Sequence, residues 1–100
     1  MEDRRRHLRV PVHYFFPVQR TAGKGVVVGL SVDGCPVESS TYVQLGRELD
    51  LSVSLPNQMN PLAVDRARVQ WGHGHQFGLS FMSLHPEEHD RLRRMVVGHS

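Results

Sequence analysis

The sequence predicts an all-β fold with a terminal helix, namely a small antiparallel β-barrel followed by one C-terminal α-helix. Three observations support this prediction. The chain has 100 residues, which is the length of a single domain. Short apolar segments with alternating polar residues recur between Val10 and Phe81, and glycine-containing turns separate them. Helical spacing of apolar residues begins only after Pro86.

The first part of the chain contains two predicted strand segments. Val10–Arg20 is rich in β-branched and aromatic residues, and the two glycines of Thr21–Gly25 predict the turn that follows it. The apolar pattern restarts at Val26, pauses at Ser31–Gly34 and resumes through Val37. We interpret this second segment as one strand interrupted by a bend or bulge.

The clearest alternation lies in the second half of the chain. One face of a half-buried strand is expected to carry Leu49, Leu51, Val53 and Leu55. Ala67–Trp71 and Phe77–Phe81 predict two more strands, which the intervening Gly72–His75 turn joins as a hairpin. We expect the core to contain the hairpin aromatics Trp71, Phe77 and Phe81.

The C-terminal segment predicts the helix. Pro86 suits the first helical position, and two glutamates follow it in the first turn while arginines come later, as the helix dipole favours. The apolar stripe of this helix consists of Leu92, Met95 and Val96. We therefore expect residues 1–9 to form a flexible arginine-rich tail and residues 10–100 to form one domain, with its helix at about 86–97.

Composition limits the classes of protein that this chain can belong to. Its net charge is only +2, so it lacks the general basicity of proteins that coat nucleic acid. Cys35 is the single cysteine, which excludes an internal disulfide and favours a reducing compartment. No apolar segment approaches the ~20 residues that span a bilayer. We expect a cytoplasmic protein that does not bind membranes.

Catalytic and metal sites are not expected. Four histidines lack cysteine or carboxylate companions at zinc-ligand spacing and are predicted to be exposed turn and helix residues: His73, His75, His85 and His89. Ser31 and Asp33 do not lie in a G-x-S-x-G elbow, so a hydrolytic triad is not indicated. The sequence predicts no enzyme activity and no cofactor.

Arginines are concentrated near the N-terminus. Four of the six residues from Arg4 to Arg9 are arginine. In an extended segment, the side chains of Arg5 and Arg9 leave on the same side about 13 Å apart. Each guanidinium can hold two phosphate oxygens or the O6/N7 edge of guanine. We predict that Arg5 and Arg9 form a two-armed clamp, with Arg4 as a weaker candidate. The alternative for this segment is a solubilising tail.

The pause in the second strand segment is the other candidate site. It presents Ser31, and Gly29 and Gly34 bracket it, so that backbone can approach a flat ligand closely. Arg5-x-x-x-Arg9 followed by this Gly29–Gly34 segment resembles the RxxxR…(D/N)xSxxG pattern of PilZ domains, the bacterial receptor modules for cyclic di-GMP. The resemblance implies a six-stranded antiparallel β-barrel with a C-terminal helix, and cyclic di-GMP as the ligand.

The resemblance implies a role for each matching residue. Arg5 and Arg9 match the motif arginines, and Ser31 and Gly34 match the motif serine and glycine. Gly29 stands where the family has Asp or Asn, whose side chain accepts hydrogen bonds from the guanine edge. Losing that contact is expected to cost about 1.5–3 kcal/mol of binding free energy.

Two functions remain open, and a third is disfavoured. The first is a cyclic di-GMP receptor that orders its tail on binding and signals to an unknown protein partner. The second is a degenerate PilZ-like adaptor with weak or no nucleotide binding, which Gly29 favours and the Arg5/Arg9 pair opposes. Binding of single-stranded nucleic acid would need an exposed aromatic platform beside basic residues, and the aromatics are predicted to face inward.

Overall fold

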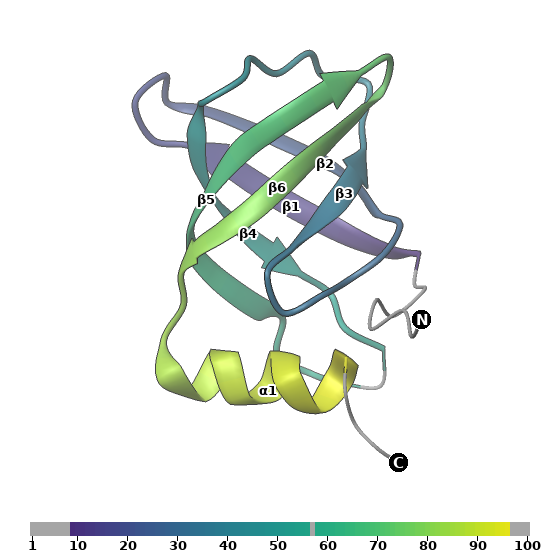
Figure 1. The fold of residues 1–100 in the computed structure, drawn as a ribbon, viewed down its shortest axis with the longest axis vertical. Helices are drawn as coiled ribbons and strands as arrows, with labels where there is room; N and C mark the ends of the chain where they lie inside the picture. The colour runs from purple at the N-terminus through teal and green to yellow at the C-terminus, as the bar shows by residue number, and fades with distance from the viewer. Residues whose placement is uncertain (1–8, 57, 97–100) are drawn as a thin grey trace.

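Six antiparallel strands close into a barrel in the computed structural model, which describes residues 9–56 and 58–96. In chain order the strands are β1 (Val10–Phe16), β2 (Thr21–Val27), β3 (Gly34–Glu38), β4 (Glu48–Val53), β5 (Leu62–His73) and β6 (Gln76–Ser83). Their order around the barrel is β1-β2-β3-β6-β5-β4, and β4 pairs with β1 to close it. The one helix in these described ranges, α1 (Pro86–Val96), lies across one end of the barrel (Figure 1). The predicted fold class is confirmed.

The turn between β1 and β2 lies earlier in the chain than predicted. β1 ends at Phe16, and the N–H of Arg20 donates to the Phe16 carbonyl at 2.7 Å, with Arg20 at φ 57°. The segment Thr21–Gly25, predicted to be the turn, is instead the first part of β2. Its glycines are needed for space, because a Cβ atom on Gly23 would lie 2.4 Å from the Tyr14 ring.

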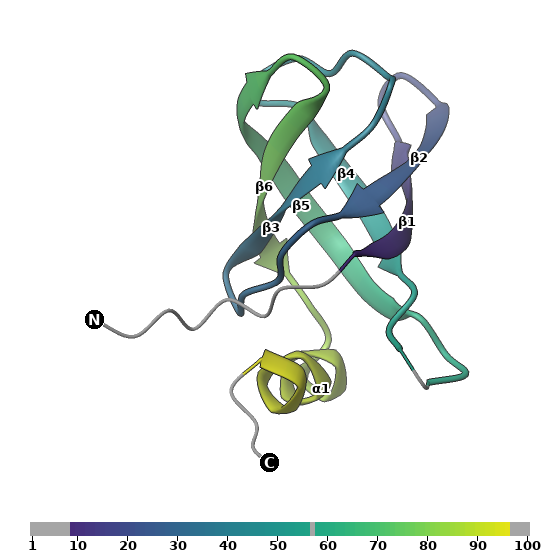
Figure 2. The same ribbon diagram turned by 90° about the vertical axis from the view of Figure 1, so that its right-hand side faces the viewer.

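The second predicted strand segment is two strands rather than one. Within it the chain reverses direction, so that Val26 pairs with Glu38 and Val27 with Val37. The loop of residues 28–33 that makes this reversal lies at the barrel end that faces α1 (Figure 2). β3 pairs on its other side with β6, from Gly34↔Ser80 to Glu38↔Gln76. The predicted bend is therefore a connection between neighbouring strands.

The alternating faces predicted for the second half of the chain are confirmed, with one exception. The inward positions of β4 and the loop after it are buried: Leu49, Leu51, Val53 and Leu55. β5 and β6 form the predicted hairpin, in which Phe77 is buried and Phe81 packs half-buried against the core.

Trp71 is the exception, because it lies on the outer surface with 44% of its area exposed. Val69 pairs with Leu79 and Trp71 with Gly78, so Gln70 is an extra residue on β5. Such a bulge inverts the alternation of side chains beyond it. The prediction that Trp71 lies in the core is wrong for this reason.

Helix α1 covers the barrel end with its apolar face. Leu92 is fully buried, and Met95 and Val96 pack partly buried against the core. The Arg91 guanidinium ties the helix to the β4–β5 connection, because it donates to the Asn60 carbonyl at 2.6 Å and to the Pro61 carbonyl at 3.2 Å. In the part of the chain that the structure describes, no helix is both long enough and apolar enough to cross a membrane.

Candidate functional site

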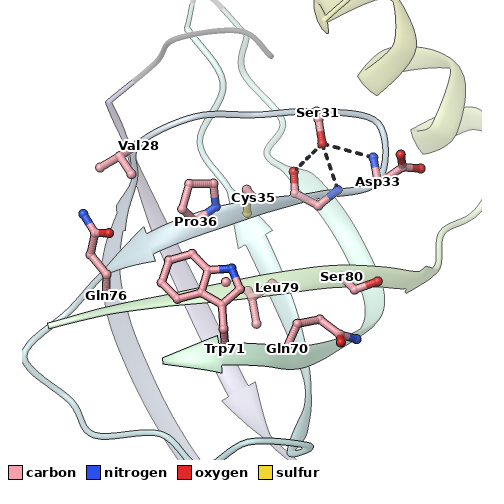
Figure 3. Close-up of a pocket in the computed structure, with 12 residues that line it drawn as sticks. Val28, Ser31, Asp33, Cys35, Pro36, Gln70, Trp71, Gln76, Leu79 and Ser80 are labelled. Carbon is pink, nitrogen blue, oxygen red and sulfur yellow. Dashed lines mark hydrogen bonds between the residues drawn. The ribbon is translucent and has the colours of Figure 1, made fainter. Parts of the chain in front are cut away.

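Ser31 closes the loop between β2 and β3 through its hydroxyl. Its Oγ accepts the N–H groups of Asp33 at 3.3 Å and Gly34 at 3.2 Å, and it donates to the Gly34 carbonyl at 3.0 Å (Figure 3). The N–H of Phe81 also donates to the Asp33 carbonyl at 2.8 Å, which fixes the loop to β6. Side-chain bonds of this kind stabilise a tight turn without regular secondary structure.

Gly34 allows the loop to enter the sheet. It is the first residue of β3, it is buried, and it pairs with Ser80 on β6. A Cβ atom at this position would lie 1.9 Å from the Leu79 carbonyl oxygen, a distance that real Cβ atoms do not adopt. The backbones of β3 and β6 can approach this closely only because residue 34 has no side chain.

A groove of about 500 Å³ lies on the outer face of the barrel beside this loop. Its walls include Ser31, Pro36, Trp71, Gln76 and Ser80, and glycines form part of its floor. Figure 3 shows Ser31 near one end of the groove, Gln76 near the other and the Trp71 indole between them. The groove therefore combines a flat aromatic surface, accessible backbone and polar side chains.

The Trp71 indole occupies space that is free only because residue 78 is glycine. These two residues are paired across β5 and β6, and a Cβ atom on Gly78 would lie 2.0 Å from the indole Nε1. The indole thus packs directly on the backbone of β6. An aromatic ring that is held flat and partly exposed can stack against a planar ligand. Sequence reasoning missed this residue because it assigned Trp71 to the core.

Arg9 does not line the groove but is connected to it through Glu38 and Gln76. Its guanidinium Nη2 donates to the Glu38 carboxylate at 2.9 Å, and its side chain is 66% exposed. The same carboxylate accepts a 3.0 Å hydrogen bond from Gln76 Nε2, and Gln76 lines the groove. The structure therefore brings Ser31 and Gly34 together but places Arg9 beside Glu38.

The other predicted site residues are Arg4, Arg5 and Gly29. Arg4 and Arg5 lie outside the described residues, so their part in a clamp stays a prediction. Gly29 is buried in the loop after β2 and does not line the groove. Its φ is not positive, since the described glycines with positive φ are Gly46 and Gly74. A side chain at residue 29 is therefore compatible with its backbone conformation.

Two ionisable groups near the groove have shifted pKa values. The hydrogen bond from Arg9, followed by that from Gln76, holds the pKa of Glu38 below its usual range, so this carboxylate is ionised at neutral pH. Burial raises the pKa of the Cys35 thiol to about 12. The lining of the groove therefore includes a neutral thiol, and a charged carboxylate lies beside the lining residue Gln76.

We expect the Cys35 thiol to be unreactive in the folded domain, because the thiolate is the reactive form and the buried site suppresses it. The raised pKa also implies that folding stability is fully present below the unfolded thiol pKa of 9.0 and falls as the pH rises above it. A disulfide exchange reagent should react slowly in buffer and rapidly in urea. Equal rates in both solvents would contradict the buried position.

The histidines that resemble possible metal ligands do not form a metal site in the described part of the chain. His73, His75 and His85 are exposed and His89 is half-buried. Among residues 9–56 and 58–96, no three or more His, Cys, Asp or Glu side chains are grouped closely enough to hold a metal ion.

The closed barrel, its capping helix and the groove beside the Ser31 loop define a small β-barrel domain. The sequence pattern of the PilZ domain matches residues 3–98. The chain therefore belongs to the PilZ domain family. No curated protein matches it in sequence.

Solved structures share this fold at low sequence identity. The PilZ domain of CeSA from a cellulose-synthesizing bacterium matches with a TM-score of 0.72 and 17% identity, covering 94% of this chain and 95% of that chain. The PilZ domain of YcgR from Escherichia coli, solved with c-di-GMP, gives 0.68 and 14%, covering 95% and 90%. The inhibitor of motility MotI/DgrA of Bacillus subtilis gives 0.76 and 15%; here 93% of this chain matches 47% of that one.

Proposed function

We propose that this domain is a cytoplasmic receptor for cyclic di-GMP, which binds in the groove on the outer face of β3, β5 and β6. The observation that carries the proposal is that two family motif residues, Ser31 and Gly34, line one groove. A third, Arg9, is connected to the groove through Glu38, which accepts a hydrogen bond from the lining residue Gln76. The proposal is supported by membership of the PilZ family and by the E. coli YcgR structure, which contains c-di-GMP.

The groove offers distinct contacts to the bases and the phosphates of this ligand. A guanine can stack on the exposed Trp71 indole, an interaction worth about 1–3 kcal/mol per base in other proteins. The guanidinium of Arg9 can hold a phosphate or the O6/N7 edge of guanine with two hydrogen bonds. Arg5 would act as the second arm of the clamp, and ordering residues 1–9 over the ligand would create a new surface for a protein partner.

A second candidate function is that of an adaptor with weak or no nucleotide binding. Gly29 favours it, because the acceptor that the family motif supplies to guanine is missing and residue 29 does not line the groove. Nucleic acid is a weaker candidate. The exposed Trp71 provides the aromatic surface that the sequence did not predict, but the net charge is only +2.

Titration calorimetry with cyclic di-GMP tests the proposal, with GTP and a short single-stranded oligonucleotide as controls. We expect saturable binding of cyclic di-GMP, and slower amide exchange in residues 1–9 when it is bound. If millimolar ligand produces neither heat nor NMR shifts, the adaptor function replaces the receptor function. Preferential binding of the oligonucleotide would instead favour a nucleic-acid-binding module.

Restoring the family residue at position 29 should strengthen ligand binding. We expect Gly29→Asp to tighten cyclic di-GMP binding by about 1–3 kcal/mol and to favour guanine over adenine, since a carboxylate accepts from N1–H and N2–H₂ of guanine. The backbone at Gly29 has no positive φ to oppose the substitution. Because Gly29 is buried and does not line the groove, the gain requires the loop of residues 28–33 to turn residue 29 toward the bound ligand. Calorimetry beside a thermal melt checks this result. Unchanged stability with equal or weaker affinity would show that residue 29 does not face the ligand.

A further inference from the structure

The Glu38 carboxylate is hydrogen-bonded both to the motif arginine Arg9 and to Gln76, which lines the groove. Glu38 follows Pro36 on the outward face of β3, and Pro36 lines the groove. One Glu38 oxygen, Oε1, accepts from Arg9 at 2.9 Å, and the other, Oε2, accepts from Gln76 at 3.0 Å. Arg9 and Glu38 are 29 residues apart in sequence, so only the folded barrel brings them together.

This pair conflicts with the proposed role of Arg9. A guanidinium that binds a phosphate or a guanine edge uses the same N–H donors that Arg9 now gives to Glu38. The carboxylate is also a negative charge beside Gln76, which lines the groove that is proposed to take a dianionic ligand. Both effects of Glu38 therefore act in the same direction, against ligand binding.

We propose that Glu38 sets the ligand affinity of this domain by competing with the ligand's phosphates for Arg9. This inference rests on the proposed function. In the ligand-free domain Arg9 is paired with Glu38, and ligand binding exchanges this ion pair for one between Arg9 and the ligand. Glu38 is thus an affinity-determining residue outside both family motifs.

The exposure of the pair limits the size of the effect. The side chains of Arg9 and Glu38 are 66% and 37% exposed. Exposed ion pairs are weak, so Glu38 does not block the ligand but lowers its affinity moderately. We expect Glu38→Gln to tighten cyclic di-GMP binding about two- to tenfold. The substitution weakens the interaction of residue 38 with Arg9, and it removes one negative charge.

Calorimetric titration of cyclic di-GMP into wild type, Glu38→Gln and two control variants tests this inference. Asp33→Asn removes a negative charge from a residue that lines the groove itself. Glu48→Gln breaks a pair with Arg68 on β5, and the Glu48 side chain has the same 37% exposure as that of Glu38. We expect Glu38→Gln to tighten binding more than either control. Thermal melts check that all four proteins are folded.

A second measurement tests, in the wild-type protein, whether Arg9 leaves Glu38 when the ligand binds. NMR titration of Glu38 should show that its pKa rises toward the ordinary glutamate value when cyclic di-GMP is bound, since Arg9 no longer donates to it. An unchanged Glu38 pKa in the complex would contradict the proposal that Arg9 leaves Glu38 for the ligand.

The calorimetric outcomes separate the alternatives. Equal tightening by Glu38→Gln and Asp33→Asn would overturn the competition for Arg9 and leave a general charge effect. Weaker binding by Glu38→Gln would also overturn it and would mean that Glu38 contacts the ligand directly, for instance at a guanine edge. If the wild type does not bind at all, the proposed function fails and this inference fails with it.

Discussion

Replacing Gly34 with alanine is expected to lower the free energy of unfolding by about 2–4 kcal/mol and to abolish binding in the groove. The new Cβ atom would meet the Leu79 carbonyl oxygen at 1.9 Å, and this oxygen belongs to the backbone of β6. A backbone atom cannot move aside as a flexible side chain can, so β3 and β6 would have to separate. The same separation would displace the Ser31 loop and the groove wall.

Gly72→Ala is the matched control for this prediction. Gly72 also lies in a strand, but a Cβ atom on it would approach the Gln76 carbonyl oxygen only to 3.9 Å, an ordinary contact. The free energy of unfolding of the Gly72→Ala variant should differ from that of the wild type by less than about 0.5 kcal/mol. Urea denaturation of both variants measures the difference. Similar stabilities for the two would show that β3 can shift to accept a side chain at residue 34.

Replacing Arg9 with alanine should weaken cyclic di-GMP binding by about 2–4 kcal/mol, the loss expected when one partner of a charged hydrogen-bonded pair is removed. The free energy of unfolding should change by less than about 0.5 kcal/mol, because the Arg9 side chain is 66% exposed and its ion pair is a surface pair. Calorimetry and a thermal melt measure the two quantities separately.

Arg4→Ala is the control for Arg9, since it removes a neighbouring positive charge that is only a weaker candidate for the clamp. It should weaken binding much less. Equal losses for the two variants that disappear at moderate salt concentration would indicate a diffuse cationic patch. The spacing of Arg5 and Arg9 would then have no role in recognition.

The fold was predictable where alternation alone determines which side chains are buried. Leu49, Leu51 and Val53 alternate with polar residues, and each is buried as its position predicts. The turn at residues 17–20 was not predictable in the same way, because the glycines that normally indicate a turn lie in β2, where Gly23 makes room for the Tyr14 ring and Gly25 for the Glu38 carbonyl. A glycine pattern does not by itself distinguish a turn from a crowded strand.

The candidate site was predictable only where its residues are close in sequence. Ser31 and Gly34 are separated by two residues, and the turn that joins them follows from local hydrogen bonding. Trp71 reaches the groove because of a bulge in pairing with β6, and the run of residues from Ala67 to Trp71 shows no break in alternation. The contact between Arg9 and Glu38 depends on barrel closure, so no local pattern indicates it.

The pairing of β2 with β3 has a consequence for the motions of the barrel. Among the described residues, only Val26 and Val27 are in register with β3, whereas every residue of β2 is in register with β1. Local opening requires the least free energy where the fewest backbone hydrogen bonds must break together. The barrel is therefore expected to open most readily between β2 and β3, next to the Ser31 loop. A ligand that contacts both Arg9, which precedes β1, and the groove on β3 would link the strands on the two sides of this pairing. It would therefore slow the opening of the barrel between β2 and β3.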